Sequence, residues 1–293
     1  MSLFNRAKII DQNFTNYVKS EKFPKSEISL SQNEIDDYQK KGYVVPKCRL
    51  PNQKLHLLEE AVEELVQNNP SVPPEYLIGP HIAQSTNRNH KVLSKKFLDF
   101  CLDSDILDMV EGILGENIIL WSSGVFCKPA KLGRVVPWHQ DGQYWPIRPL
   151  AVCSVWIAID DALPENGCMR FIPGSHTGRH LYQHVAINEH NAVLNQGVKP
   201  SEFDKSKAVD NVLFAGQLSI HDVYLIHGSN ANTSGRRRAG YVMRYMPGTS
   251  VYDREMPVGQ SSDLAQSDFS KRPIWLARGV DYTGANDFLL GHE

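Results

Sequence analysis

The feature that most constrains the fold is a succession of short apolar runs between Ile118 and Met246. Each run is rich in Val, Ile, Phe, Trp and Tyr and is followed by Gly, Pro or Asn, a composition typical of β-strands. We expect strands at Ile118–Phe126, Arg134–Asp141, Ala151–Ile159, Cys168–Pro173, Gln217–Ile220, Tyr224–Ile226 and Ala239–Met246. About eight strands of this length favour a jelly roll, in which two antiparallel sheets face each other.

Helices are predicted before this β-rich stretch. Ser31 and Glu34 have the spacing of a capping box, and Gly42 is a suitable terminator for the helix that would begin there. A second helix is predicted after Pro51 and a third from Ser104, because apolar residues recur at helical spacing in both segments. Helices followed by a run of strands indicate a mainly β fold with an N-terminal helical layer.

We interpret residues 1–293 as a single domain. The helical layer spans 31–117, the jelly-roll core 118–250 and a C-terminal segment 251–293. Within the core, the stretch 177–215 is polar and has little periodicity. A segment of that length inside a compact domain is usually a functional lid or a mobile insertion, and we expect a lid-like insertion here.

Composition and charge exclude several classes of protein. The formal net charge of −2 argues against a nucleic-acid binder, and nothing approaches the roughly 20 apolar residues of a membrane span. The five cysteines include no CxxC pair, which disfavours a zinc ribbon or a disulfide framework. The first residues lack the apolar run of a signal peptide. We therefore expect a cytoplasmic protein, monomeric or homodimeric, that acts on a small molecule.

The segment Trp138–Gly142 contains two metal-binding residue types at alternate positions. Residues two apart on a strand point to the same face, so His139 and Asp141 could both be directed at one point inside the sheet. Such a pair could supply two adjacent ligands of an octahedral metal ion. The alternative is a surface strand whose two polar residues face solvent.

A second histidine strengthens the metal hypothesis. His227 follows an apolar strand and precedes a turn rich in Gly, Ser and Asn, where it could bring a third ligand to the open end of the β core. Two imidazoles and one carboxylate are the facial triad of non-haem iron(II) oxygenases. Alternatively, His227 is a hydrogen-bonded histidine at a strand end.

The third candidate element is a cation. Arg238 opens the last apolar strand, and a guanidinium can hold a carboxylate through two parallel hydrogen bonds. A 2-oxo acid that chelates a metal has a distal carboxylate that needs such a partner. Ser229 could add a hydroxyl to the same carboxylate. We interpret the neighbouring Arg236 and Arg237 as parts of a solvated turn.

Three longer blocks of sequence are similar to those of a known family. They are W-H-Q-D-G-Q-Y-W at Trp138–Trp145, E-N-G-C-M-R-F-I-P-G-S-H at Glu165–His176 and I-H-G-S-N-A-N-T-S-G-R-R-R at Ile226–Arg238. In this order they resemble the phytanoyl-CoA dioxygenase (PhyH) family of iron(II)/2-oxoglutarate oxygenases. Further likeness at Glu34–Val45 and Arg278–Asp281 extends the resemblance over most of the chain.

The resemblance implies a double-stranded β-helix and an enzyme that uses Fe(II), 2-oxoglutarate and O₂. It places the metal ligands at His139, Asp141 and His227. It places the 2-oxoglutarate contacts at five positions, which are Arg238, Ser229, Lys128, Trp156 and Gln140. Related halogenases have Ala or Gly where this chain has Asp141, so the resemblance favours hydroxylation over halogenation.

Two other classes remain open. One is a cupin-like zinc or manganese lyase or isomerase, which needs no O₂; the Arg238 carboxylate site argues against it. The other is a non-catalytic jelly-roll binding protein, against which the His-Asp-His set argues.

The substrate side is predicted from strand alternation. If Arg238 points into the barrel, Arg244 on the same strand points there too. A buried guanidinium needs an anionic partner, which would be either an Asp or Glu of the helical layer or the substrate itself. Tyr144, Trp145 and Arg148, close to the His139–Asp141 pair, are assigned to the same substrate side.

Overall fold

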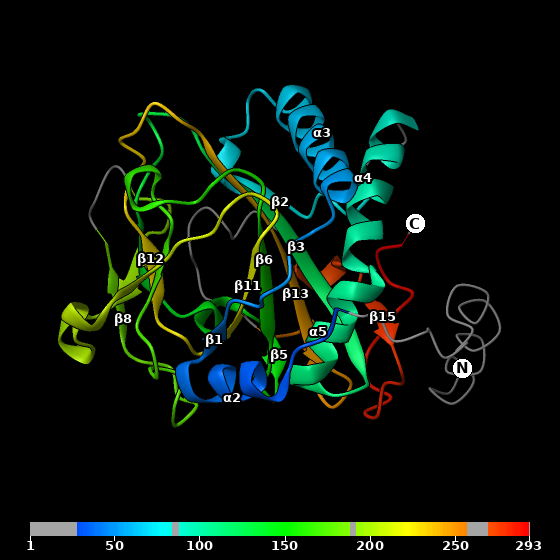
Figure 1. Ribbon diagram of the computed structural model, residues 1–293. Coiled ribbons are helices and arrows are strands. Elements are labelled where there is room, and N and C mark those ends of the chain that lie inside the picture. The colour runs from blue at the N-terminus through cyan, green and yellow to red at the C-terminus, as the bar shows by residue number, and fades with distance from the viewer. Residues whose placement is uncertain (1–27, 84–87, 188–191, 257–268, 293) are drawn as a thin grey trace.

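Two antiparallel sheets face each other and form a jelly roll in the computed structural model, which describes residues 28–83, 88–187, 192–256 and 269–292. The larger sheet has the strand order β1-β11-β6-β13-β3-β15, with β2 paired to β3. The smaller sheet has the order β10-β7-β12-β4. In Figure 1, helices α3, α4 and α5 lie along one side of the larger sheet, and β12 of the smaller sheet lies on the other side.

The helices and strands have these bounds. The α-helices are α2 (Gln32–Lys41), α3 (Asn52–Asn68), α4 (Arg88–Cys101) and α5 (Ser104–Leu114). The strands of the larger sheet are β1 (Tyr43–Val44), β2 (Leu77–Ile78), β3 (Ile118–Lys128), β6 (Cys153–Ala158), β11 (Leu218–Asp222), β13 (Arg238–Pro247) and β15 (Trp275–Arg278). Those of the smaller sheet are β4 (Val136–His139), β7 (Met169–Phe171), β10 (Val209–Asn211) and β12 (His227–Ser229). Two further pairs are β5 (Ile147–Arg148) with β14 (Val251–Tyr252) and β8 (His184–Ala186) with β9 (Gln196–Val198).

Strand β13 shows how the larger sheet divides its side chains between two faces. Tyr241 and Tyr245 point toward the helices, where their hydroxyls donate to the backbone oxygens of Phe97 and Cys101 in α4. Residues at the alternate positions, among them Val242 and Arg244, point to the other face and line a cavity between the sheets. The period of two along an extended strand thus separates an apolar core from a functional interior.

Most predicted elements are present, with corrections at their ends. The capping box of Ser31 and Glu34 is formed and Gly42 ends α2 with a φ of 83°, as the sequence predicts. Helix α5 is capped by Asp103, whose carboxylate accepts from the backbone of Asp105, and not by Ser104. Helix α4 was not predicted. The strand expected at Tyr224–Ile226 begins instead at His227, because the preceding residues form a turn.

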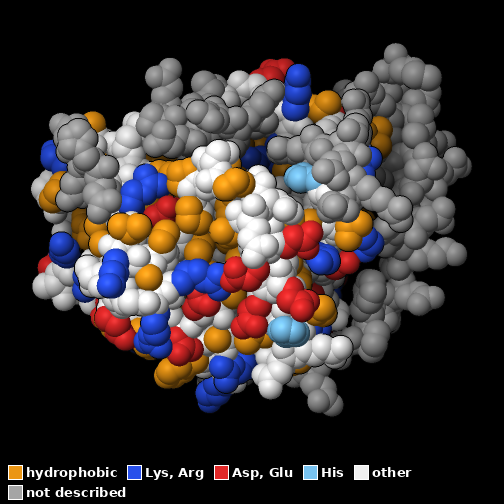
Figure 2. Space-filling view, turned by 90° about the horizontal axis from the view of Figure 1, so that it is seen from above, with side chains coloured by type: hydrophobic (Ala, Val, Ile, Leu, Met, Phe, Trp, Pro, Cys, Tyr) orange, Lys and Arg blue, Asp and Glu red, His pale blue; other side chains and the backbone are white. Residues whose placement is uncertain are grey.

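The polar stretch 177–215 contains more regular structure than its composition indicates. Its described residues include β8, β9 and β10, and Val193 and Leu194 are buried against the cavity. On the face shown in Figure 2, acidic, basic and apolar side chains drawn in colour are interspersed, without one sign of charge dominating. Within the described residues, no helix is long and apolar enough to cross a membrane.

Candidate metal centre and cavity

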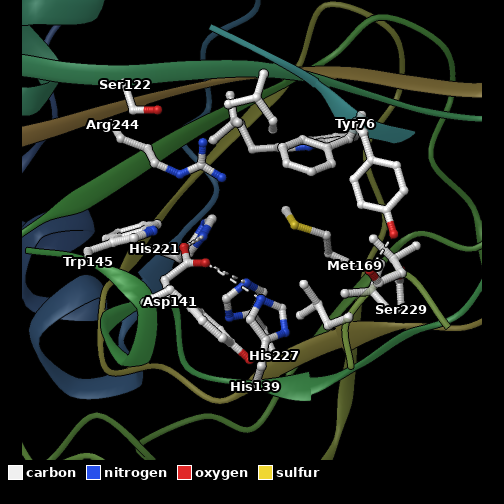
Figure 3. Close-up of a pocket in the computed structure, with 18 of the residues that line it drawn as sticks. Tyr76, Ser122, His139, Asp141, Trp145, Met169, His221, His227, Ser229 and Arg244 are labelled. Atoms are coloured by element: carbon white, nitrogen blue, oxygen red, sulfur yellow. Dashed lines mark hydrogen bonds and ion pairs between the residues drawn. The ribbon is translucent and has the colours of Figure 1, made fainter. Parts of the chain in front are cut away.

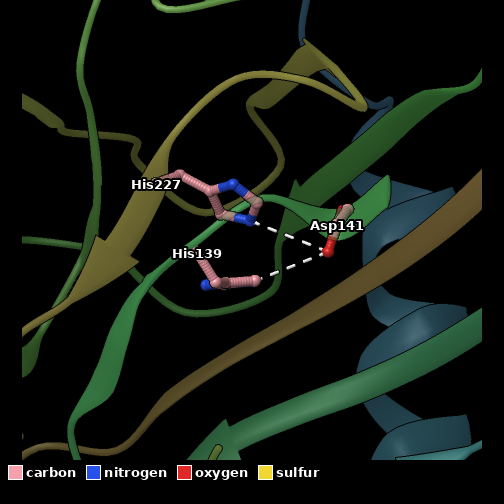
Figure 4. A group of neighbouring side chains, drawn as sticks. All are labelled: His139, Asp141 and His227. Carbon is pink, nitrogen blue, oxygen red and sulfur yellow. Dashed lines mark ion pairs between the residues drawn. The ribbon is translucent and has the colours of Figure 1, made fainter. Parts of the chain in front are cut away.

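Three side chains of the smaller sheet converge on one point. His139 ends β4 and lies opposite His227 of β12 in the antiparallel register, which brings the two imidazole centroids to 4.2 Å. Asp141 follows at the start of a short 3₁₀ helix, η2 (Asp141–Tyr144). One ligand atom from each of the three residues lies within 4.8 Å of the others, and all three are buried. Figure 4 shows the carboxylate facing both rings.

Backbone hydrogen bonds orient both imidazoles. Nδ1 of His139 is 2.9 Å from the carbonyl oxygen of Pro137, and Nδ1 of His227 is 2.9 Å from that of Leu225. A carbonyl oxygen can only accept, so each Nδ1 carries the proton and each Nε2 presents a lone pair to the centre. The two Nε2 atoms are 3.5 and 4.0 Å from Oδ1 of Asp141. This is the tautomer that a metal ion requires of a histidine ligand.

Electrostatics favour the same protonation states. Burial, and then the proximity of His139, holds the pKa of His227 well below its usual range, so its ring is neutral. Burial alone would raise the pKa of Asp141, but contacts with His139 and His221 and the charge of Arg244 hold it well below its usual range. A neutral imidazole at His227 and an ionised carboxylate at Asp141 fit a divalent cation, and softer thiolate ligands are absent from this set.

A cavity opens over the three ligands. Its volume is about 1130 Å³ including the space at its mouth, and its walls are largely aromatic and aliphatic. The wall residues are Tyr76, Ile78, Trp121, Ser122, Phe126, Val136, Tyr144, Trp145, Trp156, Met169, Val193, Leu194, His221, Gly228, Ser229, Arg238, Val242, Arg244, Phe269 and Arg272. In Figure 3, Arg244 and Ser229 lie on opposite sides of the space, with the three ligands below.

At one end of the cavity lies a basic group that we call the Arg238 corner, formed by Arg238, Lys128, Ser229 and Trp156. Arg238 and Lys128 are register partners on β13 and β3, and the guanidinium lies 5.5 Å from the centroid of the Trp156 ring. Burial lowers the pKa of Arg238 to about 10; burial and the charge of Arg238 lower the pKa of Lys128 to about 6. Arg238 Nε and Ser229 Oγ are buried without a hydrogen-bond partner among the described residues.

At the other end lies what we call the Arg244 corner, formed by Arg244, Arg272, Ser122 and Trp145. Arg244 and Ser122 are register partners on β13 and β3, and Arg272 donates to Ser122 Oγ at 2.9 Å. The Arg244 guanidinium lies 5.2 Å from the centroid of the Trp145 ring. Arg244 Nε is buried and has no hydrogen-bond partner in the described parts of the chain.

Most of the residues assigned to the site by sequence line the cavity, including Tyr144 and Trp145. Lys128 is the register partner of Arg238 but is not part of the cavity wall. Three further interpretations need correction. Gln140 lies outside the cavity wall, because alternation along the chain turns its side chain away from the cavity. Its amide nitrogen donates to the backbone oxygens of Tyr224 and His180, and its amide oxygen accepts from the backbone nitrogen of Tyr182. That arrangement does not fit contact with 2-oxoglutarate. Arg148 is exposed and donates to nearby backbone carbonyls, away from the cavity wall. Arg237 is not simply solvated, since it is ion-paired with Asp160 and Glu63.

Three contributors were not assigned to the site from sequence. One is His221 on β11, whose Nε2 lies 3.7 Å from Oδ2 of Asp141. Ser122 and Arg272 received no role at all. Alternation could have indicated Ser122, because it lies an even number of positions from Lys128 and so shares its face of β3. Arg272 has no such signal, because it lies in the irregular C-terminal segment and reaches the cavity only through tertiary packing.

The comparisons with known proteins converge on one family. The family model described as phytanoyl-CoA dioxygenase (PhyH) matches residues 38–240. A probable phytanoyl-CoA dioxygenase of Caenorhabditis elegans is 26% identical over 72% of this chain and 73% of its own length. A phytanoyl-CoA dioxygenase domain-containing protein 1 homolog of Caenorhabditis briggsae is 31% identical over 53% of this chain. That match spans 56% of the C. briggsae protein. A probable alpha-ketoglutarate-dependent hypophosphite dioxygenase of Stutzerimonas stutzeri is 31% identical over 48% of this chain and 49% of its own.

Solved structures share the fold. The apo form of the non-heme monooxygenase ThoJ superimposes with a TM-score of 0.65 at 22% identity, covering 86% of this chain and 85% of its own. The epimerase SnoN, in complex with Fe3+, alpha ketoglutarate and nogalamycin RO, has a TM-score of 0.58 at 21% identity. That superposition covers 75% of this chain and 84% of SnoN. At these identities the likeness establishes the jelly roll.

Proposed function

Because the chain belongs to the phytanoyl-CoA dioxygenase (PhyH) family, we propose that it is a non-haem iron(II) oxygenase that uses 2-oxoglutarate and O₂. The observation that carries this proposal is the convergence of two imidazole Nε2 atoms and one carboxylate beneath a cavity that also contains an unpaired arginine. Three protein ligands on one side of a metal leave its other positions open toward the cavity, as oxygen chemistry requires.

His139, Asp141 and His227 would hold the metal. The carbonyl oxygens of Pro137 and Leu225 keep both imidazoles in the ligand tautomer, so little reorganisation is needed when the ion binds. An iron(II) ion held there would supply the oxidising chemistry, with O₂ as oxidant and 2-oxoglutarate oxidised to succinate and CO₂. The presence of Asp141 favours hydroxylation of a C–H bond, because its carboxylate would take the position that a halide occupies in related halogenases, which have Ala or Gly there.

The Arg238 corner would hold the distal carboxylate of 2-oxoglutarate. Arg238 can donate two parallel hydrogen bonds, and the buried Ser229 hydroxyl, which has no partner among the described residues, can donate a third. Lys128 lies beside Arg238, where a bound carboxylate would favour its charged form, and its Nζ donates to the backbone oxygen of Asn230 at 2.5 Å. Gly240 makes room for Trp156, since a Cβ there would lie 2.0 Å from Cζ2 of the indole. The indole can then form the wall beside the guanidinium.

The cavity walls would exclude water from the reacting centre. Tyr144, Trp145 and Val242 place apolar surface beside the ligands, which strengthens electrostatic interactions inside and protects reactive species from side reactions.

The five cysteines are free thiols, in keeping with the reduced cytoplasmic setting that we propose.

Anaerobic titration tests the proposal. Iron(II)-loaded protein should bind 2-oxoglutarate and develop a visible charge-transfer band, and exposure to O₂ with a suitable substrate should release succinate. Zinc(II) should occupy the same ligands without supporting turnover. A cupin-like lyase or isomerase would instead turn over with zinc or manganese in the absence of O₂, and that result would contradict the proposal. A binding protein would show no metal-dependent succinate release with any substrate.

A further inference from the structure

The Arg244 corner contains positive charge that the proposed reaction does not use. None of the ion pairs formed within the described parts of the chain involves Arg244 or Arg272. Burial lowers the pKa of Arg244, and burial together with the charge of Arg244 lowers the pKa of Arg272. Two neighbouring guanidiniums in a largely apolar cavity are costly unless an anion joins them.

The two corners are built at separate positions along β13. Arg238 and Arg244 are six positions apart on β13, which places their Cα atoms about 20 Å apart at ~3.3 Å per residue. An extended five-carbon chain spans roughly 5 Å, at about 1.5 Å per bond with normal bond angles. A distal carboxylate held at the Arg238 corner therefore does not neutralise Arg244, which interacts with Asp141 through its charge but forms no ion pair within the described residues.

The position of Arg244 next to the metal ligands also favours a substrate role. Arg244 is the register partner of Ser154 on β6, and the Ser154 hydroxyl lies 3.5 Å from Oδ2 of Asp141. The guanidinium therefore lies on the Asp141 side of the centre, across the cavity from Ser229 (Figure 3). A molecule anchored there would lie directly over the open side of the three ligands.

Aromatic rings surround the two guanidiniums. Phe126 and Trp145 lie beneath the Arg244 guanidinium, with ring centroids 5.6 and 5.2 Å away, and Phe269 lies 4.8 Å from that of Arg272. These rings keep the cations oriented and add flat apolar surface beside them. The chemistry of this wall suits a ligand with an oxyanion at one end and a compact apolar body.

We propose that the Arg244 corner binds the anionic group of the substrate, an organic acid whose carboxylate or phosphonate is held by Arg244 and Arg272. This inference rests on the proposed function, and it adds the substrate class. Ser122 keeps Arg272 directed into the cavity by accepting its hydrogen bond, while the aromatic wall receives the apolar body of the acid.

Three matched probes test this inference in protein loaded with iron(II) and 2-oxoglutarate under anaerobic conditions. Benzoate and phenylphosphonate carry the two oxyanions, and benzamide has nearly the shape of benzoate without its charge. In calorimetric titrations at least one anion should bind at least about tenfold more tightly than benzamide, because only the anion gains charge-assisted hydrogen bonds. The tighter of the two anions identifies the preferred oxyanion. Equal binding of benzamide and both anions, or failure of both anions to bind, would overturn the inference.

Substitutions then locate the anion. Arg244→Gln and Arg272→Gln should each remove most of the preference for the anion over benzamide, while the affinity for 2-oxoglutarate stays within about threefold of wild type. Arg236→Gln is the matched control, since that arginine is exposed and pairs with Glu165. If neither cavity variant folds, Ser122→Ala keeps both cations and should still weaken anion binding, because Arg272 loses its acceptor. An unchanged preference in that variant would then contradict the inference.

Competition separates this inference from the proposed function. Raising the 2-oxoglutarate concentration should not displace the bound anion. Displacement, or an Arg244→Gln variant that loses 2-oxoglutarate as severely as Arg238→Gln does, would show that the Arg244 corner holds the co-substrate. The inference would then be wrong although the oxygenase function stood. Failure of the wild-type protein to bind iron(II) and 2-oxoglutarate would instead contradict the function itself.

Discussion

The Arg238 and Arg244 corners are built on the same plan at opposite ends of one strand pair. Each combines an arginine of β13 with its register partner on β3, which is Lys128 at one end and Ser122 at the other. Each arginine has a buried Nε without a hydrogen-bond partner in the described residues, and each packs on an indole ring. The corners differ in one further residue. Ser229 of the smaller sheet belongs to the Arg238 corner, and Arg272 of the C-terminal segment belongs to the Arg244 corner.

This difference shows how one fold could bind two different acids, the co-substrate at the Arg238 corner and the substrate at the Arg244 corner. The Arg238 corner is formed entirely by the strands of the jelly roll, so it is suited to a co-substrate that every turnover needs. The Arg244 corner depends on a residue from an irregular segment, where a change of sequence alters the site without disturbing the sheets. Loops around a conserved scaffold are where specificity is expected to vary.

The largest expected effect comes from the candidate metal centre between the two corners. Asp141→Ala should lower turnover by at least about 1000-fold, because loss of one ligand removes several kcal/mol of metal binding and transition-state stabilisation. The fold should persist, since β4 keeps its apolar contacts. Iron content, succinate release and circular dichroism would be compared with those of Asp210→Ala, a surface carboxylate paired with Arg170. Substantial turnover by Asp141→Ala would contradict the assigned ligand set.

The second effect distinguishes the corners by their ligands. Arg238→Gln should weaken 2-oxoglutarate binding by about 100-fold, because two charge-assisted hydrogen bonds to the distal carboxylate are lost. The exposed neighbour Arg236→Gln should change it by less than about threefold. Anaerobic calorimetry of the iron(II)-loaded variants measures both values. Equal losses in the two variants would mean that the carboxylate site has been placed wrongly.

A third, smaller effect concerns the proton on Lys128. Its pKa of about 6 makes this side chain largely neutral at pH 8 before the co-substrate binds. A carboxylate bound at the Arg238 corner favours the ammonium and raises this pKa, so binding at pH 8 should take up as much as about one proton. The affinity for 2-oxoglutarate should therefore be flat below about pH 6 and fall as the pH rises above it, by at most about tenfold per unit.

Titrations in buffers of different ionisation enthalpy measure this uptake. Lys128→Met should abolish it, and Lys131→Met, a substitution on the following turn, serves as the control. Proton uptake that persists in Lys128→Met would assign the titrating group elsewhere.

The smallest effect concerns the stability of the protein without ligands. Arg237→Met should lower the free energy of unfolding by about 1 kcal/mol, because that arginine is paired with Asp160 and Glu63. Arg244→Met should change it by less than about 1 kcal/mol, since loss of the charge interaction with Asp141 is offset by replacing a desolvated cation with an apolar chain. Chemical denaturation of the metal-free proteins measures both. A loss of several kcal/mol in Arg244→Met would instead indicate an internal partner for that cation.

Most of the fold was predictable because its signals are local. The capping box at Ser31, the left-handed glycine at Gly42 and the alternating apolar residues of β3 and β13 each depend on neighbours in sequence. Short strands such as β1 and β15 lack such a signal, because pairing with β11 and β3 alone makes them extended. Helix α4 was missed although its signal is local, since the buried Leu93, Phe97 and Cys101 recur at helical spacing.

The amino-acid sequence by itself identified the three side chains that converge as a candidate metal centre, and the shared face of Arg238 and Arg244. The reason is that alternation along an extended strand is a property of the backbone and holds wherever the strand lies. Only the tertiary structure decided which cations have acidic partners. Arg237 is ion-paired with Asp160, whereas the adjacent Arg238 has a buried Nε without a hydrogen-bond partner among the described residues. It also decided that His221 meets Asp141 and that Arg272 joins Arg244, because charge pairing depends on distances between segments that are far apart along the chain.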